Sequence, residues 1–135
     1  MTVFVCIDDR GGMTFNSRRQ SRDVRVIEDM IKDVGDKALY VTDFSEELFL
    51  DSEASAISLP DPLTAAPDSF VFIENLPLAM HLDRIKRLVI YRWNRKYPFD
   101  TELDVNPEKE GFILTRVTEF AGNSHEKITK EVYER

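Results

Sequence analysis

The chain has few of the residues that build redox, metal or disulfide sites. Its 135 residues include one cysteine, Cys6, and two histidines, His81 and His125. A single cysteine excludes an internal disulfide and a cysteine-rich metal site. Cys6 lies in the apolar run Val3–Ile7, which favours a buried and unreactive thiol. We expect each histidine to be a surface or hydrogen-bonded residue rather than a metal ligand.

Long apolar runs and the common nucleotide or nucleophile motifs are also missing. The longest apolar runs fall well short of the ~20 residues that cross a bilayer, and no basic region precedes an apolar stretch at the N-terminus. We therefore expect a cytoplasmic protein without a membrane partner. The chain contains no Gly-x-x-x-x-Gly-Lys loop and no Gly-x-Ser-x-Gly elbow. With 42% hydrophobic and 32% charged residues, the composition predicts one globular domain over residues 1–135.

Basic residues are missing from the middle of the chain, where only acidic ones occur. No lysine or arginine lies between Lys37 and Arg84. The net charge of −7 argues against nucleic acid as a partner. The first quarter, by contrast, holds five arginines: Arg10, Arg18, Arg19, Arg22 and Arg25. These arginines indicate either an anion site or pairing with the acidic middle, and the sequence leaves both interpretations open.

The first third of the chain predicts a buried strand, a loop and a helix. Thr2–Ile7 is continuously apolar, which is typical of a central strand buried on both faces. Asp8–Gln20 is polar and predicts a long loop. Apolar residues then recur at spacings of three, four and three: Val24, Ile27, Ile31 and Val34. We expect a helix over about Ser21–Val34, with a serine cap at its start and Gly35 at its end.

The rest of the chain predicts further strands and two short helices. The strands are expected at Ala38–Val41, Ala56–Leu59, Phe70–Ile73, Leu88–Trp93, Phe112–Phe120 and Lys127–Tyr133. A helix capped by Asp43 is expected to run to Phe49, and another over Leu76–Leu82. The last two strands have no helix between them. This order predicts an α/β single domain with a mostly parallel central sheet and antiparallel C-terminal edge strands.

Three segments of the C-terminal half resemble dihydrofolate reductase: Arg87–Trp93, Asp100-Thr101 and Asn123-Ser124-His125. The resemblance implies a dihydrofolate-reductase-like fold, in which the first helix carries a carboxylate near its start. Asp23 looks like that carboxylate, which in the family binds the pterin ring and assists its protonation. Helical periodicity alone places Asp23 on the core-facing stripe, four residues before Ile27. The alternatives are an acid that interacts with the helix dipole or that pairs with neighbouring arginines.

The segments that hold NADPH in this family have no match here. Val41-Thr42-Asp43-Phe44 stands where the family has Gly-Arg-x-Thr/Ser, and Glu74-Asn75 stands where it has paired glycines. At ~4 Å and an effective dielectric of ~20, Glu74 would repel one diphosphate charge by about 4 kcal/mol. A strand and a helix of the family's middle are absent, as is the arginine that holds the folate carboxylate. We therefore expect no NADPH and name no other cofactor.

We expect a small heteroaromatic or anionic ligand in a cleft between Asp23 and the strand ends. Counting back from Asp100-Thr101 places Tyr91 where the family's threonine bonds the catalytic carboxylate. Asp23 is the catalytic candidate, and the ligand-binding candidates are Cys6, Arg18, Arg19, Arg22, Ile27 and Tyr91. This predicts a binding or regulatory module. The alternatives are a reductase with a flavin or other altered cofactor and a protein–protein interaction module, and an edge strand would allow a homodimer.

Two further segments resemble a group of short bacterial chains, some of which are labelled ribonuclease Z. These segments are Arg18–Asp23 and Asn123–Tyr133. That activity needs a His-x-His-x-Asp-His motif for two zinc ions, and this chain has only His81 and His125. We therefore exclude that activity.

Overall fold

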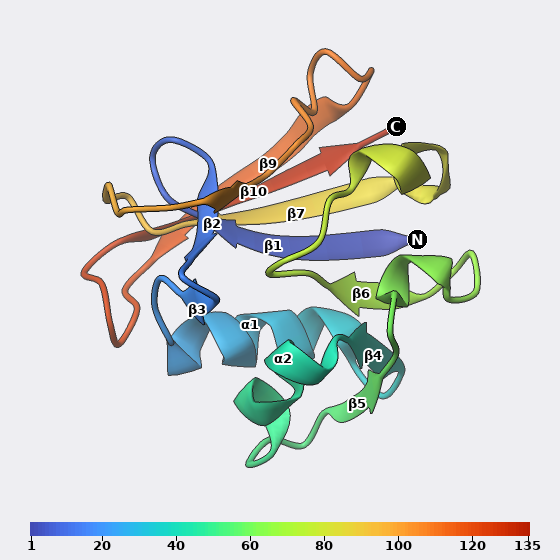
Figure 1. Cartoon of the computed structure of the whole chain (residues 1–135), viewed down its shortest axis with the longest axis horizontal. Coiled ribbons are helices and arrows are strands. Elements are labelled where there is room, and N and C mark those ends of the chain that lie inside the picture. The colour runs from blue at the N-terminus through green and yellow to red at the C-terminus, as the bar shows by residue number, and fades with distance from the viewer.

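A seven-stranded sheet forms the centre of the protein, in a computed structural model that describes residues 1–135. Its strands are β1 (Thr2–Ile7), β4 (Ala38–Val41), β5 (Ser55–Ser58), β6 (Phe70–Phe72), β7 (Arg87–Arg92), β9 (Ile113–Phe120) and β10 (Ile128–Glu134). They lie side by side in the order β5-β4-β6-β1-β7-β10-β9 (Figure 1). All neighbours are parallel except β10, which runs antiparallel to β7 and to β9. The predicted α/β domain and its antiparallel C-terminal strands are confirmed.

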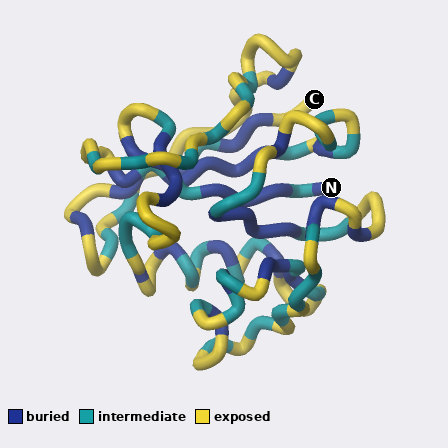
Figure 2. Tube along the Cα trace, in the orientation of Figure 1, coloured by how far each residue is buried: buried dark blue, intermediate teal, exposed yellow.

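The central position of β1 follows from its sequence. Val3, Phe4 and Val5 have no exposed surface, because β1 pairs with β6 on one side and β7 on the other while both of its faces are covered. Figure 2 shows the buried residues concentrated along the central strands and the exposed ones in the loops around them. A continuously apolar strand is stable only in such a position, since every side chain then leaves water.

One helix of eleven residues, α1 (Val24–Val34), covers one face of the sheet. It begins after Asp23, whose side chain caps it, rather than after the serine that the sequence predicted. Gly35 ends it with a φ of 68°, a conformation that favours glycine. The residues buried against the sheet are Val26, Met30 and Val34, so the contact face is rotated relative to the predicted one, and Val24 is exposed.

Four shorter helical segments connect the strands: α2 (Asp43–Glu46) and the 3₁₀ helices η1 (Glu47–Phe49), η2 (Pro62–Thr64) and η3 (Ala79–Arg84). The predicted cap at Asp43 is wrong, because Thr42 precedes α2 and the Asp43 carboxylate accepts a hydrogen bond from Ser58 on β5. The predicted helix over Leu76–Leu82 begins later, as η3. The Asp104 carboxylate accepts hydrogen bonds from the backbone N–H groups of Leu78 and Ala79, which are free donors at the start of η3.

The predicted loop after β1 contains two strands of a second, small sheet. β2 (Gly12–Phe15) pairs with β3 (Arg18–Arg19) and with β8 (Thr101–Glu102), in the order β3-β2-β8. Asn16 and Ser17 join β2 to β3 with φ angles of 49° and 60°, the pattern of a tight two-residue hairpin turn. The loop prediction was wrong here, because β8 comes from a distant part of the chain and its pairing cannot be read from the local pattern.

Two apolar clusters fill the two sides of the sheet. One lies under α1 and includes Phe4, Met30, Phe72 and Tyr91. The other lies under the connecting segments and includes residues of β1, β7, η2 and the loop before β9. None of the helices is both long and apolar enough to cross a membrane.

Candidate functional site

The carboxyl ends of β1, β4 and β6 meet at one edge of the sheet. After β1 the chain forms β4 and β6, which lie on one side of β1. After β6 it crosses to β7, on the other side of β1, so the direction in which strands are added reverses at β1. In open α/β sheets, ligands bind in the crevice that such a reversal creates. The residues that follow these strand ends, Asp8, Thr42 and Glu74, are all buried. The crevice is therefore the first place to look for a site.

Side chains of the protein itself occupy this crevice. Arg19 on β3 donates to both oxygens of Glu74, from Nε at 2.9 Å and from a terminal nitrogen at 3.1 Å. Ser45 donates to Glu74 Oε2 at 2.6 Å. Arg19 also donates to Glu47 at 2.5 Å and to the Phe44 carbonyl at 2.9 Å, and its guanidinium lies over the Phe44 ring. The hairpin of the small sheet is thereby joined to α2, η1 and β6.

The charge of Glu74 is therefore compensated, contrary to the sequence-based estimate of an isolated repulsion. Burial lowers the pKa of Arg19, but the hydrogen bonds and charges of Glu74 and Glu47 outweigh it, and the net shift is upward. A bidentate arginine–carboxylate pair of this kind is among the strongest charged contacts in proteins. The crevice is thus filled by an internal ion pair rather than lined by free carboxylates.

The three arginines predicted to bind a ligand divide into two that form ion pairs, Arg19 and Arg22, and one that does not, Arg18. Arg22 donates to Glu47 at 2.8 Å, and Arg25 to Glu28 at 3.3 Å. Pairing with the acidic middle, one of the two open interpretations, therefore accounts for Arg19 and Arg22. Arg18 forms no ion pair and its side chain is exposed on β3. Among the arginines predicted to bind a ligand, Arg18 is the one available for an anion.

Asp23 is buried and all its hydrogen-bonding positions are occupied. Oδ1 accepts from the backbone N–H of Arg25 and Val26, and Oδ2 accepts from the Ser124 N–H at 2.9 Å and its hydroxyl at 2.6 Å. Burial raises the pKa of this carboxyl, but the hydrogen bonds from Ser124 and the helix N-terminus outweigh it, and the net shift is downward. Asp23 is thus an ionised cap that joins α1 to the turn before β10. Its catalytic role stays a prediction.

Tyr91 does not meet Asp23 as the sequence predicted. Its hydroxyl donates to Asp29 at 2.7 Å, and Lys130 bonds the same carboxylate at 2.7 Å. Burial and the charge of Asp29 raise the pKa of Tyr91 well above its usual value. The helical acids that bond side chains of the sheet are therefore Asp29, six residues after Asp23, and Asp33, which also bonds Lys130. Counting back from Asp100-Thr101 placed Tyr91 at the family's threonine position, but its hydroxyl bonds Asp29 and not Asp23.

Cys6 lies beside Tyr91 in the pairing of β1 with β7. Burial, followed by the charges of Glu74 and Asp23, raises the pKa of its thiol well above the usual value. The thiol is thus protonated at neutral pH and a poor nucleophile, although Cys6 is partly buried rather than fully buried as the sequence favoured. His81 lies 3.2 Å from Asp61. No group of three or more His, Cys, Asp or Glu side chains is placed to hold a metal ion.

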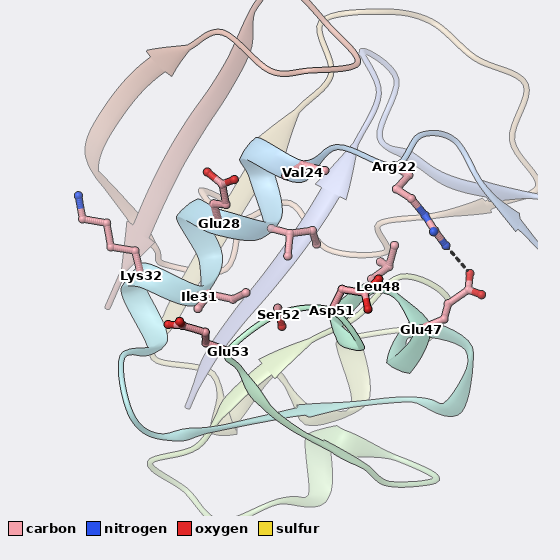
Figure 3. Close-up of a pocket in the computed structure, with 11 residues that line it drawn as sticks. Arg22, Val24, Glu28, Ile31, Lys32, Glu47, Leu48, Asp51, Ser52 and Glu53 are labelled. Carbon is pink, nitrogen blue, oxygen red and sulfur yellow. Dashed lines mark hydrogen bonds and ion pairs between the residues drawn. The ribbon is translucent and has the colours of Figure 1, made fainter.

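An open groove of about 540 Å³ lies between α1 and η1 (Figure 3). Four apolar side chains line it: Val24, Ile27, Ile31 and Leu48. Its charged lining consists of Arg22 and Lys32 with four carboxylates, Glu28, Glu47, Asp51 and Glu53. Figure 3 shows the Arg22–Glu47 ion pair closing one end. The groove contains two of the predicted ligand-binding residues, Ile27 and Arg22, but not Cys6, Arg18, Arg19 or Tyr91.

A hydrogen-bonded chain of four side chains was not foreseen from the sequence. Tyr97 bonds His125 Nε2 at 2.6 Å, Ser124 bonds His125 Nδ1 at 2.6 Å, and Ser124 bonds Asp23. Trp93 stacks on the His125 ring at 5.0 Å. The adjacent Ser124-His125 pair was noticed only as part of a resemblance, because Tyr97 and Asp23 lie far from it in the chain.

Compared with known proteins, the chain matches no protein-family model and no curated protein. The resemblance to dihydrofolate reductase therefore stays a prediction from the sequence.

Proposed function

We propose that the protein is a binding module for a small heteroaromatic molecule, which lies in the groove between α1 and η1. The observation that carries this proposal is the apolar floor of the groove, formed by Ile27, Ile31 and Leu48 beside a charged rim. Its volume of about 540 Å³ is within the roughly 300–1,000 Å³ of small-molecule sites. Flat aromatic rings gain most from such a floor, since they bury a large apolar area with few rotatable bonds.

The rim favours a neutral or cationic ring over an anionic one. Four carboxylates and two cations line the groove, and one of the cations, Arg22, already pairs with Glu47. Asp51 and Glu53 have no ion-pair partner. An amino group on the ring would lie near these acids, whereas a phosphate or carboxylate would meet like charges. We therefore assign an amino-substituted heteroaromatic ligand to the groove.

The scaffold for this function is a reduced dihydrofolate-reductase-like domain. The order of elements supports it: a central β1, a loop, α1, then β4 and α2, and at the end the antiparallel pair β9 and β10. In this proposal NADPH is not bound, because Arg19, Ser45 and Glu74 fill the crevice in which the resemblance places its diphosphate. The module is thus regulatory or ligand-sensing rather than a reductase.

Thermal unfolding with a ligand panel tests the proposal. A ligand at 100 times its dissociation constant stabilises the protein by about 2.7 kcal/mol, which is easily measured. We expect a shift with aminopterins or aminopyrimidines and none with NADPH or flavins. Leu48→Asn should abolish the shift, whereas Leu50→Asn, two residues away and 71% exposed, should leave it unchanged. A clear shift with NADPH would refute the proposal. The absence of a shift with every heteroaromatic compound in the panel would also refute it.

A second candidate function, an interaction module that forms a homodimer, is favoured by β9. This strand is eight residues long, lies at the edge of the sheet, and is exposed from Ile113 to Glu119. Ile113 and Val117 are exposed by 68% and 51%. Antiparallel pairing of β9 with β9 of a second copy would satisfy the free backbone groups of both strands around a twofold axis. Two charged residues of β9, Arg116 and Glu119, and the bulge near Thr115 weaken this pairing. We therefore expect the fraction of dimer to rise with protein concentration.

Sedimentation equilibrium measures this second candidate. We expect a species of twice the 15.7 kDa chain mass at high protein concentration. Val117→Lys should remove it, whereas Met80→Lys, at an 85% exposed position on η3, should not. A single-chain mass at every concentration would exclude the dimer.

A further inference from the structure

The groups around the Arg19 side chain form a binding site for a guanidinium ion. Glu74 accepts from Nε and from one terminal nitrogen, which also donates to the Phe44 carbonyl, and Glu47 accepts from the other terminal nitrogen. The Phe44 ring covers the flat face of the guanidinium, 4.5 Å from it. Ser45 orients Glu74 through a bond of 2.6 Å. This arrangement matches the planar fork of a guanidinium, whereas an ammonium ion cannot fill it.

Arg19 enters this site from a short segment, residues 16–19, which we call the strap and which consists of the turn Asn16-Ser17 and β3. Apart from its pairing with β2, the strap is held by a bond from the Asn16 N–H to Asp100 and by the contacts of the Arg19 side chain. Open hollows of about 570 and 470 Å³ lie against it, and Asn16 lines both. Ser17 has a φ of 60°, which is uncommon for a residue other than glycine. The strap is therefore held in place chiefly by β2 and by Arg19.

The closed strap leaves buried acceptors unpaired. Three buried side-chain polar atoms of the protein lack a hydrogen-bond partner, and two of them flank the ion pair in the sequence: Gln20 Oε1, one residue after Arg19, and Asn75 Oδ1, one residue after Glu74. Both residues line the hollows against the strap. When the strap lifts, the hollows open and water can reach these oxygens, which removes the cost of burying them unpaired. This cost favours an open arrangement and partly offsets the ion pair that keeps the strap closed.

We propose that the crevice at the strand ends binds an alkylguanidinium compound, and that the strap blocks this site by inserting Arg19 as an internal ligand. An incoming guanidinium takes over the bonds of Arg19 one for one, so the exchange leaves neither Glu74 nor Glu47 unpaired. The ligand then competes with the effective concentration of Arg19 and with the pairing of β3 and β2. Binding here does not require a ligand in the groove between α1 and η1.

Isothermal titration of Arg19→Ala tests the guanidinium site with two probes. N-Ethylguanidinium replaces the atoms that this substitution removes, and ethylammonium carries the same charge without the planar fork. We expect Arg19→Ala to bind N-ethylguanidinium about tenfold or more tightly than it binds ethylammonium. The unaltered protein should bind N-ethylguanidinium about tenfold or more weakly than Arg19→Ala, because its open state is a minor one. Arg22→Ala is the matched control, since it removes the other arginine bonded to Glu47 but leaves Arg19 on Glu74. Equal binding by Arg19→Ala and Arg22→Ala would overturn the proposal.

Release of the strap is measured in the unaltered protein, so this test does not depend on whether a variant folds. The Nε–H group of Arg19 donates to Glu74, and two-dimensional ¹H–¹⁵N NMR spectra report its signal. We expect N-ethylguanidinium to move this signal to the position of a solvent-exposed arginine, whereas ethylammonium at the same concentration leaves it in place. If the signal stays in place at every N-ethylguanidinium concentration at which the protein remains folded, Arg19 is a permanent structural partner of Glu74 and the strap is not autoinhibitory.

Discussion

The ion pair between Arg19 and Glu74 makes a prediction whose size follows from burial. The two side chains are only 13% and 8% exposed. Arg19→Met leaves Glu74 buried with Ser45 as its one remaining partner, and loss of one member of a buried pair typically costs about 3–5 kcal/mol. Glu74→Met should cost less, because Arg19 keeps Glu47 and the Phe44 carbonyl. The double variant should be more stable than the sum of the two losses predicts.

Urea unfolding of the four proteins measures this coupling, with the free energy of unfolding extrapolated to water. The matched control is Arg25 with Glu28, an exposed pair at i,i+3 whose side chains are 61% and 57% exposed. Such a pair contributes about 0.5 kcal/mol or less. If Arg19→Met costs no more than Arg25→Met, the crevice is not closed by a buried ion pair. The proposal that this ion pair fills the crevice and keeps out the diphosphate of NADPH would then fail as well.

Three further predictions concern the titrating groups. Asp23→Ala should lower the free energy of unfolding by about 2 kcal/mol, since α1 loses its cap and the Ser124 N–H its acceptor. Because the pKa of Asp23 is lowered, its carboxylate contributes fully to the free energy of unfolding above about pH 4. This contribution is lost as the pH falls through the pKa of Asp23 in the folded protein, and acid unfolding measures the loss. The pKa of His125 is lowered in the folded protein, so the unfolded state takes up a proton on this residue more readily. The free energy of unfolding should therefore be highest above about pH 6.5 and decrease below it. His125→Gln should flatten this part of the dependence of stability on pH. The partly buried Cys6, whose pKa is raised, should react with a thiol reagent much more slowly in the native protein than in urea, and equal labelling rates would contradict this.

The strands of the main sheet could be predicted from the sequence because their burial is nearly complete. Thr2–Ile7 and Leu88–Trp93 are continuously apolar, and such runs are stable only between two neighbours and under two covered faces. The small sheet could not be predicted, since β2 and β8 are four-residue and two-residue strands whose partners lie far apart in the chain. The start of α1 was placed too early because Asp23, rather than a serine, caps the helix.

The candidate site was predictable in its residue types but not in its pairings. The sequence showed arginines in the first quarter and acids in the middle, which left both an anion site and internal pairing open. Only the fold shows that Arg19 and Arg22 are paired while Arg18 is free. The bond between Asp23 and Ser124 spans 101 positions, so no local pattern could reveal it.

The amino-substituted ring proposed for the groove makes a last prediction at Glu47, which lines the groove and bonds both Arg19 and Arg22. A cation that enters the groove near Glu47 competes first with Arg22, which is 57% exposed and has Glu47 as its sole ion-pair partner. Arg19 is held in addition by both oxygens of Glu74 and by the Phe44 carbonyl, so loss of Glu47 leaves β3 in place. Glu47→Gln should accordingly weaken the binding of an amino-substituted ring while the midpoint of urea unfolding stays nearly unchanged. Equal binding by Glu47→Gln and the unaltered protein would show that the groove does not hold the amino group.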